Sequence, residues 1–292
     1  MKGKTVYHLL ALFVTIVWGA TFVSTKVLLL YGLTPANIFF IRFLMAYIIV
    51  WFVGPKTIWA AAKKDELLFV VLGITGGSLY FLAENSALKY TLASNVSLII
   101  CTAPLLTAFL SHFFVKGERL SKSLIYGSVL ALAGVAFVVY NGSFILKVNP
   151  IGDLLTVSAA LLWGFYTIIY KHLDARYPVL FITRKVFFYG LITITPTFFF
   201  SPFLTGAAIL FHPVVAANLL FLGLIASMLC YFLWNIAIKH LGAIKTTNYI
   251  YLTPIVTLIT SVIVLKETIT PVALLGAALI LTGVSLAERG RS

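Results

Sequence analysis

The stretch SLYFLAENSALKY at residues 78–90 is largely apolar, yet it carries the carboxylate of Glu84 well inside an expected helix. The only basic residue near it is Lys89, at the helix end. A charge is costly in hydrocarbon, so Glu84 should face a bundle interior or a water-filled cavity. The pattern returns 150 residues later as YFLWNIAIK at residues 231–239, where Trp234 replaces the acid. A repeated frame with one unrepeated acid predicts a functional site at Glu84.

The composition is that of an integral membrane protein. Of 292 residues, 61% are hydrophobic and 10% charged, with a mean hydropathy of +1.07, whereas soluble domains are about 25% charged. The 21 Lys and Arg exceed the 8 Asp and Glu, which in a soluble chain would suggest nucleic acid. Here most basic residues fall in short loops, so we expect the lipid bilayer and no nucleic acid as a partner.

Ten segments have the roughly 20 residues that a membrane-spanning helix needs. They are 7–30, 35–54, 67–88, 92–115, 122–141, 151–172, 178–200, 214–238, 243–265 and 271–287. The loops between them are short, and many contain the Pro or Gly residues that end or begin helices. The expected fold is all-α, with ten transmembrane helices.

Loop charge predicts the orientation, because cytoplasmic loops are enriched in Lys and Arg. With a cytoplasmic amino terminus, the loops on the far side hold only Lys26, Lys89, Lys147 and Lys266. Both termini are therefore expected in the cytoplasm of a multi-pass protein of the cell membrane.

The two halves of the chain, 1–145 and 146–292, repeat one another in all five pairs of spans. The matches include Trp18 with Trp163, Pro35 with Pro178, Asn85 with Asn235, Pro104 with Pro254, and Gly134 with Gly283. Each half has five spans, an odd number, so the second copy must be inverted. Inverted repeats are typical of secondary transporters with a site at the repeat interface.

These features resemble the drug/metabolite transporter superfamily, EamA type. The resemblance rests on two five-helix repeats, Trp-Gly near the start of each, and a mid-helix Pro followed by a Glu in each fourth span. It implies ten helices around a central cavity lined by helices one, three, four, six, eight and nine. It also implies export of amino acids or similar metabolites. A metabolite or nucleotide-sugar exchanger of the same superfamily and a passive channel are the alternatives.

The candidate substrate-binding residues are polar or aromatic side chains of the expected lining helices. They are Trp18, Thr21, Tyr80, Glu84, Asn85, Trp163, Tyr166, Tyr170, Trp234, Asn235, Asn248 and Tyr251. Such side chains would give a cavity flat walls and hydrogen-bond donors, and they suit a neutral, zwitterionic or cationic solute better than a polyanion. The alternative is structural: tryptophans that pack, and amides that bond across helices.

Three further roles are predicted for residues inside the spans. Glu84 is the expected proton-coupling group, since no other acid is predicted at membrane depth, with a helix-pinning hydrogen bond as the alternative. Pro104 and Pro254 are expected hinges for alternating access, or else static kinks. Arg42, like Arg184, is expected to extend to the membrane interface.

No enzyme signature, cofactor motif or metal-ligand spacing is present in the sequence, so we expect a transporter without cofactor or metal. Its partners are a small-molecule substrate and, through Glu84, protons. The small-residue stripe of Gly127, Ala131 and Gly134 is expected to pack within one chain. The oligomeric state is therefore expected to be a monomer or a weak homodimer.

Overall fold

The computed structural model describes residues 2–114, 122–140, 149–201, 203, 206–268 and 270–289, and every regular element among them is a helix. The first half contains α1 (Lys2–Leu30), α2 (Pro35–Val53), α3 (Lys63–Gly73), η1 (Ile74–Ser78), α4 (Leu79–Tyr90), α5 (Ala93–Ile100), α6 (Ala103–Phe114) and α7 (Lys122–Tyr140). The second contains α8 (Pro150–Leu173), α9 (Val179–Ile194), η2 (Thr195–Phe199), η3 (Ala207–Phe211), α10 (Pro213–Leu220), η4 (Phe221–Leu229), α11 (Cys230–Leu241), α12 (Ala243–Thr247), η5 (Asn248–Leu252), α13 (Thr253–Leu265) and α14 (Pro271–Arg289).

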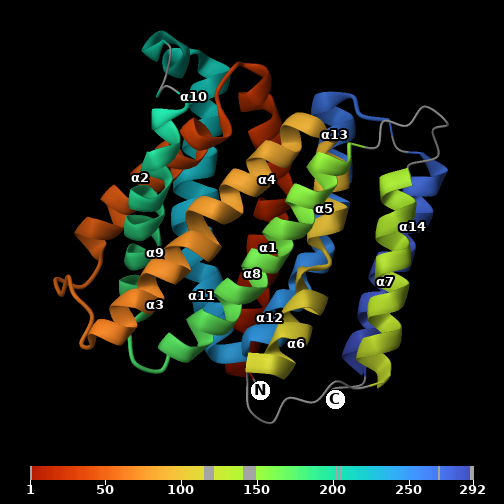
Figure 1. Ribbon diagram of the computed structural model, residues 1–292, viewed down its shortest axis with the longest axis horizontal. Coiled ribbons are helices and arrows are strands. Elements are labelled where there is room, and N and C mark those ends of the chain that lie inside the picture. The colour runs from red at the N-terminus through yellow and green to blue at the C-terminus, as the bar shows by residue number, and fades with distance from the viewer. Residues whose placement is uncertain are drawn as a thin grey trace.

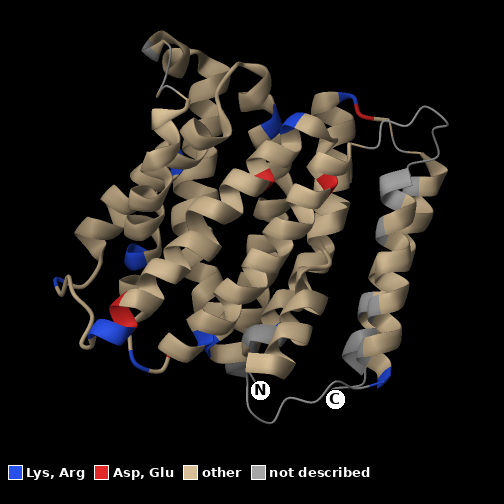
Figure 2. Ribbon diagram, in the orientation of Figure 1, with Lys and Arg blue, Asp and Glu red and all other residues tan. Residues whose placement is uncertain are grey.

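Eight helical segments of the described chain are long and apolar enough to cross a membrane. They correspond to eight of the ten expected spans, and the other two, α7 and α14, contain shorter apolar stretches at Ile125–Gly134 and Leu274–Gly283. Helices suit this setting because they satisfy their backbone hydrogen bonds internally where no water is available. Figure 2 shows charged residues mostly at the two ends of the bundle. The protein is a multi-pass membrane protein.

Four of the spans are irregular near their middle. The third and eighth contain the π-helical segments η1 and η4, and Gly77 within η1 has non-helical dihedral angles (φ −129°, ψ −108°). The fourth is broken between α5 and α6, just before Pro104, and the ninth passes through the 3₁₀ segment η5 just before Pro254. Proline has no N–H to continue a helix, which accounts for breaks at these places. The expected kinks are therefore present.

The helices form a bundle beside which α7 and α14 lie as a separate pair (Figure 1). Within the bundle, α4 packs on α8, α1 on α11 and α13, and α2 on α9 and η4, so helices of the two halves interdigitate. The first residues of α1 and the last residues of α14 lie on the same side of the molecule (Figure 1). A chain that begins and ends on the same side of a membrane crosses it an even number of times.

One polar link joins the two halves at the end of the bundle opposite α1's start. The Glu267 carboxylate accepts hydrogen bonds from Ala93 N (2.9 Å), Ser94 N (3.3 Å) and Ser94 Oγ (2.8 Å). It therefore caps the amino terminus of α5, where the helix dipole favours an anion. Nearby, Lys26 Nζ donates to the carbonyls of Leu88 and Thr91.

Small residues bring α7 and α14 into backbone contact, as the Gly stripe predicts. A Cβ atom on Gly134 would lie 2.6 Å from the Gly276 carbonyl oxygen and 2.7 Å from Ile280 N. A Cβ on Gly283 would lie 2.5 Å from the Gly127 carbonyl oxygen. Only glycine permits this approach, so the stripe packs within the chain.

We expect Gly134→Ala and Gly283→Ala each to destabilise the α7–α14 pair by about 1–3 kcal/mol, because the added methyl groups meet backbone atoms that cannot move aside. Thermal unfolding of the detergent-purified protein measures this. Gly206→Ala is the matched control, since its Cβ would meet nothing within 4 Å. Equal melting temperatures for all three variants would contradict the packing described.

Candidate functional site

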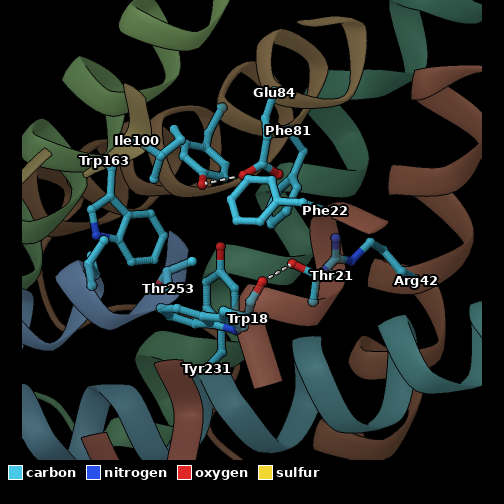
Figure 3. A pocket seen from close by; sticks show the side chains of 12 residues that line it. Trp18, Thr21, Phe22, Arg42, Phe81, Glu84, Ile100, Trp163, Tyr231 and Thr253 are labelled. Atoms are coloured by element: carbon cyan, nitrogen blue, oxygen red, sulfur yellow. Dashed lines mark hydrogen bonds between the residues drawn. The ribbon is translucent and has the colours of Figure 1, made fainter. Parts of the chain in front are cut away.

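A buried cavity lies where the two halves meet (Figure 3). From α1, α2, α4 and α5 it is lined by Trp18, Thr21, Phe22, Arg42, Tyr80, Phe81, Glu84 and Ile100. From α8, α11, η5 and α13 it is lined by Trp163, Tyr231, Ile250 and Thr253. Its free space is about 40 Å³, which holds only a few water molecules.

Glu84 lines this cavity from α4, as predicted for an acid that avoids lipid. Its side chain is 6% exposed, and its Oε1 accepts a hydrogen bond of 2.7 Å from the Tyr80 hydroxyl. The two side chains meet because residues four apart share one face of a helix. No described residue donates a hydrogen bond to the second carboxylate oxygen. The carboxylate therefore keeps capacity for a further partner.

Arg42 corrects one sequence-based expectation. It does not extend to the membrane interface: its side chain is 2% exposed and lines the cavity from α2. Its Nε donates to Ser227 Oγ at 2.8 Å, and its guanidinium lies 4.4 Å from the ring centroid of Phe81. The sequence could have indicated this position, because Arg42 shares a helix face with the apolar residues Phe39 and Ala46, which are both buried. A basic residue on the inward face cannot reach the lipid headgroups.

Arg42 and Glu84 face the same cavity without contacting one another directly. Neither takes part in the ion pairs found in the described part of the chain, which join Lys171 to Asp174, Arg176 to Asp65 and Lys185 to Glu66. Opposite charges still attract across a space of low polarity. The cavity therefore presents a cation and an anion, each with unused hydrogen-bonding capacity.

Aromatic rings form the rest of the wall. The rings of Trp18 and Trp163 meet edge to face with centroids 5.4 Å apart, and Tyr80 lies 5.3 Å from Trp163. Trp18 Nε1 donates to the Ala226 carbonyl at 3.0 Å, which fixes its ring. The Trp163 indole N–H has no partner among the described residues. Rings held in this way give a cavity flat apolar surfaces.

Tyr231 was missed as a lining residue. It lies 150 residues after Phe81 in the repeated frame, and both rings line the cavity. Its hydroxyl donates to the Gly76 carbonyl at 2.6 Å, at the π segment η1. The repeat itself was the signal that could have identified it.

Twelve residues were predicted from the sequence to bind substrate, and five of them line the cavity: Trp18, Thr21, Tyr80, Glu84 and Trp163. The structure places the others outside its lining. Asn85, Tyr166, Trp234 and Asn235 are buried between helices, and Tyr170 is buried beside them. Asn248 and Tyr251 are partly buried in η5.

The amides instead join helices. Asn235 Oδ1 accepts from the Tyr166 hydroxyl at 2.9 Å, and Asn235 Nδ2 donates to Thr183 Oγ1 at 3.0 Å. The Tyr170 hydroxyl donates to the Asn235 carbonyl at 3.2 Å, so the network ties α8, α9 and α11 together. In the first half, Asn85 Nδ2 donates to the Pro35 carbonyl at 3.2 Å. Interhelical bonds were the structural alternative for these amides.

We expect Asn235→Ala to destabilise the protein by about 1–3 kcal/mol, because it leaves the buried Tyr166 and Thr183 hydroxyls without their partner. Asn248→Ala is the matched control, being partly exposed. The apparent melting temperature in detergent is the readout. If only ligand binding changed in Asn235→Ala, with no loss of stability, the amide would belong to the substrate site instead.

Comparisons with known proteins agree with this architecture. The EamA-like transporter family matches the chain twice, at residues 5–140 and 150–288. A solved crystal structure that is 17% identical superposes with a TM-score of 0.69 over 99% of each chain, which shows the shared fold.

Curated relatives are similar over most of their length. An uncharacterized transporter of Archaeoglobus fulgidus is 29% identical, with 98% of each chain covered. A probable terminal-alkyne amino-acid exporter of Streptantibioticus cattleyicolor is 30% identical over 81% of this chain and 77% of its own. A probable amino-acid metabolite efflux pump of Escherichia coli is 27% identical over 94% and 92%. Since the family matches nearly the whole chain, this protein belongs to the EamA-like transporter family.

Proposed function

We propose that this protein is a secondary active transporter that exports a small organic metabolite, an amino acid or an analogue, by alternating access. The observation that carries the proposal is the cavity that holds Glu84 and is lined by helices of both halves. A site between two halves suits a carrier whose halves rock against each other. The names of two relatives, an amino-acid exporter and an amino-acid metabolite efflux pump, support the substrate class.

The proposed architecture is two inverted five-helix repeats with ten crossings, divided near residue 145. The two family matches fall one in each half. The irregular segments also correspond, since η1 and η4 precede the repeated frames in the two halves, and Pro104 and Pro254 follow breaks in the fourth and ninth spans. The helices α7 and α14 would supply the fifth and tenth crossings.

The size of the cavity supports a moving carrier. Its free space of about 40 Å³ suits a few waters and is too small for an amino acid. Substrate entry therefore requires helices to separate. The breaks before Pro104 and Pro254 are the proposed hinges, because backbone already irregular there can bend without losing regular hydrogen bonds. On one side, opening must also release Glu267 from the end of α5.

Transport by the purified protein in lipid vesicles is the direct test. Vesicles are loaded with radiolabelled amino acids, nucleotide sugars or phosphorylated sugars, and efflux and counterflow are measured. A carrier should saturate and accelerate labelled exchange when unlabelled substrate is present on the opposite side. Flux that does neither would indicate a passive channel, and selective transport of nucleotide sugars or sugar phosphates would favour the exchanger alternative.

The proposed location is the cell membrane with both termini in the cytoplasm. We expect Lys64→Cys to react with a membrane-impermeant thiol reagent only from the cytoplasmic side, and Lys89→Cys only from outside. Both lysines are exposed, at opposite ends of the third span. The background is Cys101→Ser, Cys230→Ser, which removes the two native thiols. The reverse labelling pattern would invert the topology.

Glu84 is the proposed proton-coupling group. We expect Glu84→Gln to abolish substrate accumulation driven by a pH gradient, because glutamine keeps the side chain's shape but cannot exchange a proton. Substrate exchange at equal pH and saturating substrate should remain largely intact, because the glutamine oxygen can still accept a hydrogen bond from the substrate. Measurement uses the same vesicles, with Glu84→Asp as the control that keeps a titratable carboxyl. Accumulation by the glutamine variant under a pH gradient alone would refute the role, and loss of all substrate binding would leave Glu84 as a substrate ligand that is not the proton carrier.

A further inference from the structure

The guanidinium of Arg42 has unused donors in the cavity. Only its Nε is hydrogen-bonded within the described chain, to Ser227, and its two terminal nitrogens have no described acceptor. Figure 3 shows the group turned toward the cavity near Thr21. A buried arginine with free donors is costly, and its planar fork matches a carboxylate in two parallel hydrogen bonds. The arrangement therefore suits a ligand that brings a carboxylate.

The second charge in the same cavity is of opposite sign. Glu84 lies on the neighbouring helix α4, and one of its oxygens accepts no hydrogen bond from a described residue. Glu84 and Arg42 attract each other across the cavity but form no ion pair. A carboxylate with a free oxygen suits an ammonium group.

We propose that this cavity, once its helices separate to admit substrate, recognises an α-amino acid by both of its charged groups, with Arg42 binding the carboxylate and Glu84 the ammonium. This inference rests on the proposed transport function and assigns the two groups of its site that bind the substrate. The apolar wall of Trp18 and Trp163 then receives the substrate's side chain, which is therefore apolar or aromatic.

The pair of charges also defines what the site rejects. A solute with only a positive charge gains from Glu84 but meets the guanidinium of Arg42 as a like charge. A solute with only a carboxylate gains from Arg42 but leaves Glu84 without its partner. Specificity of this kind arises as much from the unfavourable contacts of the wrong ligand as from the favourable contacts of the right one. Neither a lipophilic cation nor a simple organic acid satisfies both groups.

The test compares matched ligands on matched variants of the full-length protein in detergent, by calorimetric titration. The probes are L-phenylalanine and L-leucine, each with its methyl ester, which lacks the carboxylate, and its N-acetyl form, which lacks the ammonium. The variants are Arg42→Gln and Glu84→Gln. The control is Arg184→Gln, because Arg184 is likewise a buried arginine of a helix. It donates hydrogen bonds to the Pro55 and Thr57 carbonyls and does not line the cavity.

We expect the wild-type protein to bind at least one free amino acid about 30-fold or more tightly than either of its analogues, the loss typical for removing one partner of a buried charged hydrogen bond. Arg42→Gln should bind the acid and the ester about equally while still rejecting the N-acetyl form. Glu84→Gln should bind the free amino acid and its N-acetyl form about equally while still rejecting the methyl ester. Arg184→Gln should retain the wild-type ratios. These are ratios within one variant, so a partial loss of active protein does not change them.

Several results would overturn the inference. One is wild-type binding of the ester as tightly as the free acid, and another is an acid-over-ester preference that survives in Arg42→Gln. Binding of none of the six probes also rejects it. If the vesicle assay nevertheless detects carrier-type transport of another solute, the proposed transporter function stands and only the amino-acid site is wrong. Absence of any saturable transport would refute the proposed function itself.

Discussion

The cost of a charge without a partner in hydrocarbon governs where the buried polar groups of this protein lie. Lys26 reaches the carbonyls of Leu88 and Thr91, Arg184 reaches those of Pro55 and Thr57, and Lys185 binds Glu66. Each of these basic groups is satisfied by the protein's own backbone or carboxylates. Arg42 and Glu84 differ from these three basic groups, because both keep free hydrogen-bonding capacity on one cavity. The same physical rule therefore distinguishes the charges that hold the fold from the two charges to which we assign a ligand.

Eight membrane-spanning helices of the described chain and the inward position of Glu84 could be predicted from sequence, because both depend on local properties. Hydropathy over about 20 residues identifies a span, and one acid in an apolar run must face inward. Breaks near Pro104 and Pro254 follow likewise from the missing N–H of proline. The position of Arg42 depends instead on which face of α2 meets α4 and η4, a tertiary property. The prediction that Arg42 extends to the membrane interface did not take into account its apolar neighbours Phe39 and Ala46 on the same face of α2.

The amides and tyrosines show why more polar residues were predicted to line the cavity than actually line it. Asn235 and Tyr166 bond to one another between α11 and α8, while Glu84, one residue before Asn85, the match of Asn235, faces the cavity from α4. A polar side chain inside a membrane bundle is satisfied equally by a neighbouring helix or by a ligand. Sequence alone gives residue type and helical face. It does not give the rotation of each helix about its axis, which decides between the two.

The placement of Arg42 changes the chemistry that the cavity favours. With Glu84 as its only charge, the cavity would attract cations, and the sequence allowed neutral, zwitterionic or cationic solutes alike. With Arg42 beside it, the two charges balance, and a ligand gains most when it carries both signs close together. The EamA-like fold does not by itself define a substrate, since one fold serves many functions. The proposed choice of a zwitterion over a cation depends on a single guanidinium that α2 places inside the bundle.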